Sequence, residues 1–393
     1  MISLILFWVA VVLIVYTYIA FPLGVILRGL FWNRPYKHDE LTTPPSVSIV
    51  ISAYNEAGSI GAKLDNILSM AYPRECLEVI VASDGSTDGT NAIVEQYKEH
   101  RVTLLSLPRV GKAAALNAAV NAASGEIVVF SDANSMYETD AIRQLVRPFA
   151  DPKVGGVAGN QIYRREGSAG SSSDGERAYW NFDRMLKQFQ GRSGNTLAAT
   201  GAIYAIRKSL FGPIPDGVSD DLFTSTGIIV RGFRLVFAPE AVAYEPVAAT
   251  SQAEFGRKVR VIMRSWKAFA FRKELFNPVR YKFYTLQLFS HKILRYLVVF
   301  PLLTLFLVSP FVWQAGFLYQ LATLAQVLFY ACAVSGLLLH DTPFGRKKIF
   351  TIPFYFCMVN AAALFAIIKV LRGQQIKHWE PQRLGQQQYE NIQ

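Results

Sequence analysis

Cysteine is scarce in this sequence, which has three cysteines among 393 residues. Cys76, Cys332 and Cys357 are an odd number, and two of them lie in apolar segments. The sequence therefore predicts neither a disulfide framework nor a cysteine-based metal cluster. A P-loop is also missing, because Gly111 and Lys112 are not embedded in the pattern G-x-x-x-x-G-K-S/T.

Basic tracts with interleaved aromatic residues are missing from the soluble part of the chain. This absence argues against nucleic acid as a partner, although the formal net charge is +11. Two accounts of the charge stay open. In the first, the basic residues lie on a cytoplasmic face close to anionic lipid. In the second, they attract a polyanionic substrate such as a nucleotide diphosphate.

Long apolar segments lie at the two ends of the chain, and each is long enough to cross a hydrocarbon layer, which takes roughly 20 residues. The first has no basic n-region and no A-x-A site, and its apolar run is too long for a signal peptide. We therefore expect a retained transmembrane helix over residues 1–30 and about three membrane helices over 293–372, followed by a polar tail over 373–393. The four segments are Ile2 to Leu27, Ile293 to Trp313, Phe317 to Leu339 and Ile349 to Leu371.

Basic residues predict the orientation of these helices. Arg28, Arg34 and Lys37 follow the first segment, so the positive-inside rule predicts a multi-pass protein of the cell (inner) membrane with its central domain in the cytoplasm. The same rule places the loop around 346–348 inside. Four crossings would leave the basic tail outside, so the last segment is alternatively re-entrant or interfacial.

The central part, residues 31–250, alternates short apolar runs with helical patterns. This order predicts an α/β domain with a Rossmann-like, mostly parallel sheet that helices cover on both faces. The predicted strands are Val47 to Tyr54, Leu77 to Asp84, Val102 to Leu107 and Glu126 to Ala133, and the predicted helices lie near Ala57 to Met70, Asp88 to His100 and Lys112 to Ala123. The Gly/Ser-rich stretch Arg164 to Glu176 reads as a loop, either a linker or a lid over the site.

Polar residues follow the predicted strands, at the sheet edge where ligands bind in such folds. Asp84 ends the second strand, where its carboxylate can accept a base N–H. Lys112, at a helix start, is either a solvated surface lysine or a phosphate ligand. Asp132 ends the fourth strand, and it can supply one hard ligand to a metal such as Mg²⁺ while substrate phosphates complete the shell.

Two adjacent acids open a later helix in "SDDLF", which begins at Ser219. Asp220 and Asp221 lie where the helix dipole favours anions, and capping can account for one of them. The other is available as a general base.

Taken together, these stretches resemble the membrane-anchored family 2 glycosyltransferases, which have a GT-A fold and include enzymes that build extracellular polysaccharides. The resemblance runs from Val47 through about Trp266. Its motifs are "SIVISAYNEA", "VASDGSTDGT", "GKAAALN", "VVFSDAN", "ATGAIYAIRKSLF" and "VSDDLF" through "VFAPEAVAYE". The resemblance implies an inverting transfer of a sugar from a nucleotide-diphosphate donor, a uridine donor above all, to a membrane-associated glycan or lipid-linked acceptor. Other polysaccharide-assembly proteins would be possible partners.

The resemblance also implies roles for matched residues on the donor side. Asn55 and Glu56 would line the nucleotide pocket, Asp84 would contact the uracil of a uridine donor, and Lys112 would lie near the diphosphate. Asp132 would bind the divalent metal, Mg²⁺ or Mn²⁺.

Five further positions complete the implied site. Asn134 stands at the second position of the metal motif Asp-X-Asp, which lowers the negative charge by one, so we expect weaker metal binding without nucleotide than with it. Gly201 and Arg207 match the segment that borders the acceptor. Asp221 matches the catalytic base, and Asp220 takes the place of a more usual Glu.

One departure concerns the Gln-x-x-Arg-Trp motif of processive members such as cellulose and hyaluronan synthases. The nearest stretch is "RKVRV", where Arg260 matches but Arg257 and Val261 replace Gln and Trp. This favours transfer of a single sugar over processive synthesis, with a polyprenyl phosphate as an alternative acceptor and a catalytically inactive scaffold as a non-enzymatic alternative. The segment 251–292 mixes basic and aromatic residues and predicts an amphipathic helix on the membrane surface.

Overall fold

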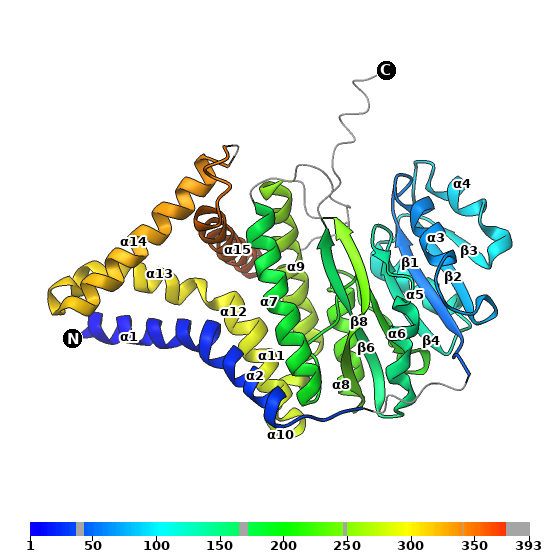
Figure 1. Ribbon diagram of the computed structural model, residues 1–393, viewed down its shortest axis with the longest axis horizontal. Helices are drawn as coiled ribbons and strands as arrows, with labels where there is room; N and C mark the ends of the chain where they lie inside the picture. Colours follow the sequence, from blue (N-terminus) through cyan, green and yellow to red (C-terminus); the bar gives the residue numbers. More distant parts are fainter. Residues whose placement is uncertain (37–42, 165–171, 247–249, 341, 375–393) are drawn as a thin grey trace, which may run out of the picture.

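In the computed structural model of the protein, the described residues are 1–36, 43–164, 172–246, 250–340 and 342–374. Lys37, most of the predicted polar tail and part of the predicted Gly/Ser loop lie outside these residues. An α/β domain forms one half of the molecule, and long apolar helices extend from it to the N-terminus (Figure 1).

The domain is built on an eight-stranded sheet in the order β3-β2-β1-β4-β7-β6-β8-β5. Strands β1 to β4 are parallel, as predicted, and β6 and β8 are parallel to each other, whereas β7 and β5 run antiparallel to their neighbours. The sheet is therefore mixed in its second half. The strands are β1 (Val47–Ala53), β2 (Leu77–Asp84), β3 (Val102–Leu107), β4 (Ile127–Asp132), β5 (Met136–Tyr137), β6 (Val154–Arg164), β7 (Tyr204–Arg207) and β8 (Arg234–Pro246).

Helices cover both faces of the sheet, which explains the unbroken apolar runs in its strands. Ile49 and Ile51 of β1 pack into the core on one face, whereas Val50 between them packs into the core on the other. Each such side chain contributes about 1.5–3 kcal/mol through burial. The first face carries α3 (Ile60–Leu68), α4 (Thr90–Glu95) and α6 (Ala141–Val146), and the second carries α5 (Lys112–Ala122) and α8 (Asp220–Val230).

Helix α7 (Ser172–Ser193) corrects the prediction of a loop over 164–176, because residues 172–176 are helical. The helix packs against α2 (Phe21–Phe31) and α15 (Lys348–Leu371). Tertiary contacts of this kind override the weak local preference of Gly and Ser for loops. Residues 165–171 of the predicted loop are outside the described part of the chain.

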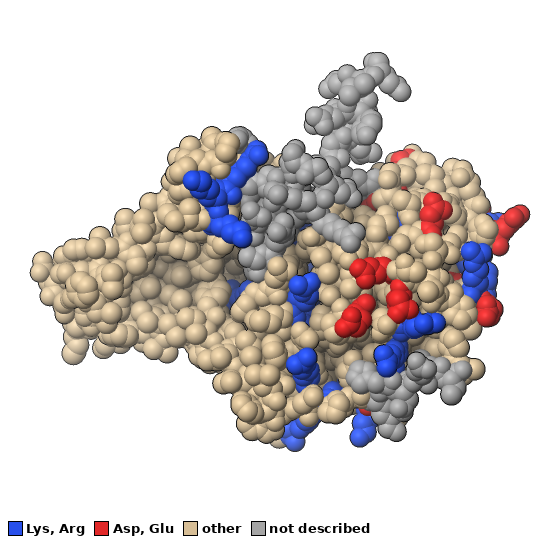
Figure 2. Space-filling view, viewed as in Figure 1, with Lys and Arg blue, Asp and Glu red and all other residues tan. Residues whose placement is uncertain are grey.

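Three helices are long and apolar enough to cross a membrane, or four if a bent pair counts as one span, within the described residues. The first, Ile2–Phe31, runs through α1 (Ile2–Val15), a π-helical turn η1 (Tyr16–Ala20) and α2. The others are α14 (Phe317–Leu338) and α15, and the bent pair joins Phe283–Leu297 to Val299–Ala315 at 48°. The lobe formed by α1, α13 (Val299–Val308) and α14 shows almost no charged side chains on the face in Figure 2.

Helix α9 (Ser251–Phe271) lies between the sheet domain and α15. Its apolar residues Val259, Ile262 and Met263 pack against Ala362 and Ala366 of α15. This stretch of α9 is therefore covered by another helix, which the prediction of a surface helix over 251–292 did not include.

Candidate active site

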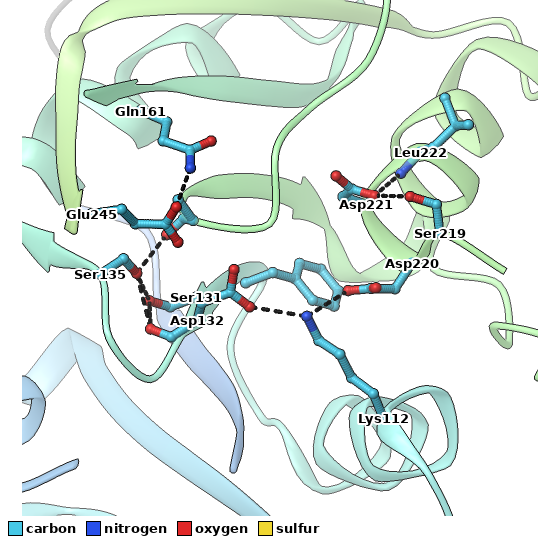
Figure 3. A network of polar contacts seen from close by, with 12 residues as sticks. Lys112, Ser131, Asp132, Ser135, Gln161, Ser219, Asp220, Asp221, Leu222 and Glu245 are labelled. Atoms are coloured by element: carbon cyan, nitrogen blue, oxygen red, sulfur yellow. Dashed lines mark hydrogen bonds and ion pairs between the residues drawn. The ribbon is translucent and has the colours of Figure 1, made fainter. Parts of the chain in front are cut away.

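Three elements bring one lysine and two acids together at the edge of the sheet (Figure 3). Lys112 lies at the first turn of α5, and its Nζ is 2.9 Å from Asp132 Oδ1 at the end of β4. The same Nζ is 3.3 Å from Asp220 Oδ2 at the start of α8. Gly111, with a φ of 93°, makes the turn that starts α5. Burial by itself would lower the pKa of Lys112, but Asp132 and Asp220 raise it, so the side chain stays an ammonium ion.

Asp221 lies beside this group and has a different environment. Its Oδ1 accepts hydrogen bonds from Ser219 Oγ at 2.5 Å and from the backbone N–H of Leu222 at 2.7 Å. Burial raises the pKa of the Asp221 carboxyl, and the charge of Asp220 raises it further. A carboxylate with a raised pKa is a stronger base than a solvated one, which suits proton abstraction near neutral pH.

A cavity of about 940 Å³ adjoins these residues and extends to the apolar helices. At one end it is lined by Lys112, Asp132 and Asp221, and at the other by Tyr18 of η1 and by side chains of α15. A volume of this size accommodates a large ligand. Between the two ends the lining is basic and aromatic, with Trp180, Arg257, Lys258, Arg260, Arg264, Lys292, Arg295 and Tyr296.

The sequence model of the family described as Glycosyl transferase family 2 matches residues 48–214, which carry β1 to β4 and this edge of the sheet. Residues 48–214 are a family 2 glycosyltransferase domain. Poly-beta-1,6-N-acetyl-D-glucosamine synthase of Staphylococcus aureus (strain MSSA476) is 28% identical over 222 residues, which cover 54% of this chain and 53% of the relative. The enzyme of the same name from Staphylococcus epidermidis matches to the same extent. The chain thus spans about half the length of the curated relatives it matches.

A solved glycosyltransferase structure extends the likeness to the apolar helices. It is the mannosyltransferase PcManGT from Pyrobaculum calidifontis in complex with GDP-Man and Mn²⁺, with a TM-score of 0.66 and 27% sequence identity. The match covers 92% of this chain and 99% of that chain. The predicted GT-A fold, flanked by apolar helices, is therefore confirmed.

Divalent metal chemistry fits the residues around Asp132. No three His, Cys, Asp or Glu side chains of the described residues form a metal site by themselves, so a metal held by Asp132 would need substrate oxygens or water to complete its shell. Ser52 Oγ and Thr200 Oγ1 line the same cavity and are buried without a hydrogen-bond partner, as expected of groups that await a polar ligand. A Cβ on Gly201 would lie 2.9 Å from Asp132 Oδ2, so glycine keeps the carboxylate accessible.

The predicted donor residues divide into two groups in this structure. Glu56 and Asn134 line the cavity with Asp132. Asn55 and Asp84 are not among the described residues that line it. Asn55 instead accepts a hydrogen bond from the N–H of Thr87 at 2.8 Å, which ties the loop after β1 to the loop after β2.

Asp84 is fully buried and holds the segment that precedes α5. Its Oδ1 accepts the N–H groups of Val110 at 2.7 Å and Gly111 at 2.8 Å, and its Oδ2 lies 2.5 Å from Arg109. The Arg109 guanidinium stacks on the ring of Tyr54 at 3.3 Å from its centroid. A nucleotide base at this edge would therefore meet Arg109 and Tyr54 before it met Asp84.

The predicted acceptor-side residues also divide into those that line the cavity and one that does not. Gly201 and Arg260 line the cavity. Arg207 does not, because it pairs with Ile127 at the opposite end of β4. Its guanidinium donates to the carbonyl oxygens of Phe149 and Val154, which is a structural role. Arg207 ends β7 beside the start of β4, at the other end of that strand from Asp132, so its position gives the expected acceptor role no support.

Sequence reasoning missed Glu245, which lines the cavity near the end of β8. Gln161 Nε2 donates a hydrogen bond to its carboxylate. Burial raises the pKa of Glu245 to about 7, and the charge of Asp132 adds to the shift. A signal was available, because Glu245 comes near the carboxyl end of a strand that is parallel to β6, the same rule that singled out Asp84 and Asp132.

A buried lysine, Lys63 of α3, was also missed. It donates to the carbonyl of Ser135 in the turn that carries Asp132, and its Nζ lies 3.5 Å from the ring centroid of Tyr137. Burial lowers the pKa of Lys63 to about 7 against the opposing charges of Asp132 and Glu245. No sequence pattern distinguishes this lysine from a surface residue of an amphipathic helix.

Proposed function

We propose that the protein is an inverting glycosyltransferase that moves a sugar from a nucleotide-diphosphate donor to a lipid-linked acceptor in extracellular polysaccharide or cell-envelope glycan synthesis. The observation that carries this proposal is the cavity that joins Asp132 and Asp221 to the apolar helices. A soluble acceptor needs no such connection. An acceptor with a lipid anchor does, because its reactive group must reach the sheet edge while its chain stays in the membrane.

The charge of the cavity supports an acceptor that carries phosphate. The lining that α9, η7 (Phe289–Ile293) and α12 (Leu294–Leu297) contribute is basic, and includes Arg257, Arg264 and Arg295. Guanidinium groups bind phosphate through paired N–H donors. A polyprenyl phosphate or diphosphate satisfies both the charge and the apolar end of the cavity, and the basic face of α9 thus gains a function as an acceptor contact.

Catalysis would proceed by a single displacement. Asp221 takes the proton of the acceptor oxygen, if that oxygen carries one, and the oxygen attacks the anomeric carbon as the bond to the nucleotide diphosphate breaks. The anomeric carbon is inverted in this step. Lys112 stabilises the charge that develops on the leaving diphosphate, because it is a permanent cation within a partly buried site. A bound Mg²⁺ or Mn²⁺, held by Asp132, would neutralise further charge on the diphosphate.

The donor is tested together with the product. Membranes that contain the protein are incubated with labelled UDP-N-acetylglucosamine, UDP-glucose or GDP-mannose, and lipid is then extracted and its glycan sized. We expect label from one donor in a lipid fraction that carries a single sugar. A ladder of long chains would indicate a processive synthase instead, and failure to bind UDP or GDP in the presence of Mn²⁺ would support a catalytically inactive scaffold.

The membrane arrangement that agrees with the basic residues has three crossings. We propose that Ile2–Phe31, the bent pair Phe283–Ala315 and α14 cross, and that α15 lies at the cytoplasmic interface. Exposed apolar side chains are frequent on α14, whereas α15 packs on α9 and lines the cavity. The loop 342–348 and the tail then both face the cytoplasm, with the catalytic domain. Protease cleavage of a C-terminal tag in sealed inverted vesicles tests this, and protection would contradict it.

A further inference from the structure

The metal motif of this chain lacks one carboxylate. Asn134 stands where Asp-X-Asp has its second acid, and an amide oxygen is a neutral ligand. Divalent cations of the Mg²⁺ and Mn²⁺ type prefer charged oxygen ligands, so the lost charge weakens the site unless another acid replaces it. A carboxylate that reaches the same space from another element would restore that charge.

Glu245 is such a carboxylate. It lies on β8, which runs parallel to β6 with Tyr163 opposite Glu245 in the register. Figure 3 shows the carboxylates of Glu245 and Asp132 turned toward the same space, although they come from strands that are not neighbours in the sheet. Both residues line the cavity.

The orientation of Glu245 is held by a chain of hydrogen bonds. Gln161 Nε2 donates to Glu245 Oε2, and also to the hydroxyl of Tyr163 at 2.9 Å. That hydroxyl accepts a second bond from Arg257 at 2.9 Å. Metal ligands are commonly oriented by hydrogen bonds of this kind, because a fixed carboxylate loses less entropy when a cation binds.

Electrostatics favour a cation at this place. Two carboxylates that face each other in a part-buried site repel more strongly than two carboxylates in bulk water. Lys63 lies behind the turn that carries Asp132, on the protein side, and Lys112 contacts Asp132 Oδ1 from the side of α5. Arg257 and Lys112 offset part of the charge of Glu245, and a cation on the cavity side would offset the charge of both carboxylates further.

We propose that Glu245 supplies the second carboxylate of the metal site, in the role that Asp-X-Asp assigns to position 134. The metal belongs to the donor site, so this inference rests on the proposed function. The cation would be shared by Asp132 and Glu245, and the donor diphosphate would complete its shell. Asn134 would then be free to contact the donor through its amide.

The test measures Mn²⁺ binding to the full-length protein in detergent, by the electron paramagnetic resonance signal of free Mn²⁺, without nucleotide and with UDP or GDP. We expect Glu245→Gln to weaken Mn²⁺ binding by about tenfold or more. Glu240→Gln is the matched control, because Glu240 is an exposed acid on the same strand. Addition of Asn134→Asp to Glu245→Gln should restore Mn²⁺ affinity, since either position then provides the second carboxylate.

Two results would overturn the proposal. One is wild-type Mn²⁺ affinity in Glu245→Gln with loss of sugar transfer only, which would make Glu245 a substrate contact. The other is failure of Asn134→Asp to restore binding. If Glu245→Gln unfolds in a thermal scan, Glu245→Asp retains the charge with a shorter reach and should bind Mn²⁺ more weakly. Mn²⁺ affinity requires neither sugar nor acceptor, so failure of the transfer proposal leaves this measurement unaffected.

Discussion

Replacement of Asp221 by Asn is the sharpest test of the catalytic assignment. The amide has nearly the shape of the carboxylate, and its oxygen can still accept the hydrogen bonds from Ser219 Oγ and the N–H of Leu222. The substitution therefore removes the basic group and keeps the start of α8. We expect a loss of stability of no more than about 1 kcal/mol, the contribution of one hydrogen bond.

The expected loss of activity follows from the role. A general base raises the reaction rate by about 10²- to 10⁴-fold, which corresponds to about 3–5.5 kcal/mol of transition-state stabilisation. We expect Asp221→Asn to lower the transfer rate by that factor. Donor binding should persist, because Lys112 and Asp132 are unchanged. The assay measures the transfer rate with labelled donor and, separately, nucleotide affinity by calorimetry. Asp216→Asn is the control, since Asp216 precedes the same helix but is not among the described residues that line the cavity.

The pH profile gives the same test an independent readout. Burial and the charge of Asp220 raise the pKa of Asp221. Because the base must be ionised, the transfer rate should fall as the pH drops through that pKa. Asp220→Asn removes a like charge and should move this acid limb to lower pH, whereas Lys112→Met removes an opposite charge and should move it to higher pH. Wild-type transfer by Asp221→Asn, or shifts of the wrong sign, would refute the assignment.

Three further outcomes are expected. Gly201→Ala should weaken Mn²⁺-dependent donor binding by about tenfold, or about 1.4 kcal/mol, because its Cβ would lie 2.9 Å from Oδ2 of Asp132, the proposed metal ligand. Gly24→Ala is the control and should bind donor normally, because Gly24 has open space around it and is not among the described residues that line the cavity. Lys112→Met should lower kcat/KM by about 10²- to 10³-fold, and added Mn²⁺ that restored the rate would contradict its role. Glu254→Gln should lower the free energy of unfolding by about 3 kcal/mol, measured by thermal unfolding. The Glu254 carboxylate of α9 is fully buried, pairs with Arg257 at 2.6 Å and Lys258 at 3.4 Å, and accepts a hydrogen bond from the Tyr355 hydroxyl of α15. An unchanged melting temperature would show that the contact between α9 and α15 does not depend on this carboxylate.

The first half of the domain was predictable because its signals are local. The predicted bounds of β2 and β3 match the structure, and those of β4 differ by one residue at each end. Each strand is a short apolar run that ends in or is followed by polar residues, and strands of one parallel sheet end at one edge. That rule predicts that Lys112 and Asp132 lie close together, and their ion pair agrees with it, whereas Asp220 was placed at the site only by the family resemblance.

The prediction was less successful where a position depends on packing. Residues 172–176 read as loop from their Gly and Ser content, yet they begin a long helix held by α2 and α15. Arg207 shares a motif with Gly201, but the two lie at opposite ends of a short stretch that crosses the sheet. A strand moves the chain by about 3.3 Å per residue, so six residues suffice to separate a cavity residue from one on the far edge.

The sequence by itself determined the class of fold, the apolar helices and the identity of the groups that chemistry requires. A strand, an amphipathic helix and a transmembrane helix each have a periodicity or a length that the chain displays without reference to its partners. Only the tertiary structure decided which acids share one space. Glu245 and Asp132 lie more than a hundred residues apart, and nothing local to either predicts that β8 brings one carboxylate to the other. The same holds for α9, whose basic side chains face a cavity because α15 covers the neighbouring apolar face. Contacts between distant segments depend on how whole layers pack, and that energy is spread over many residues.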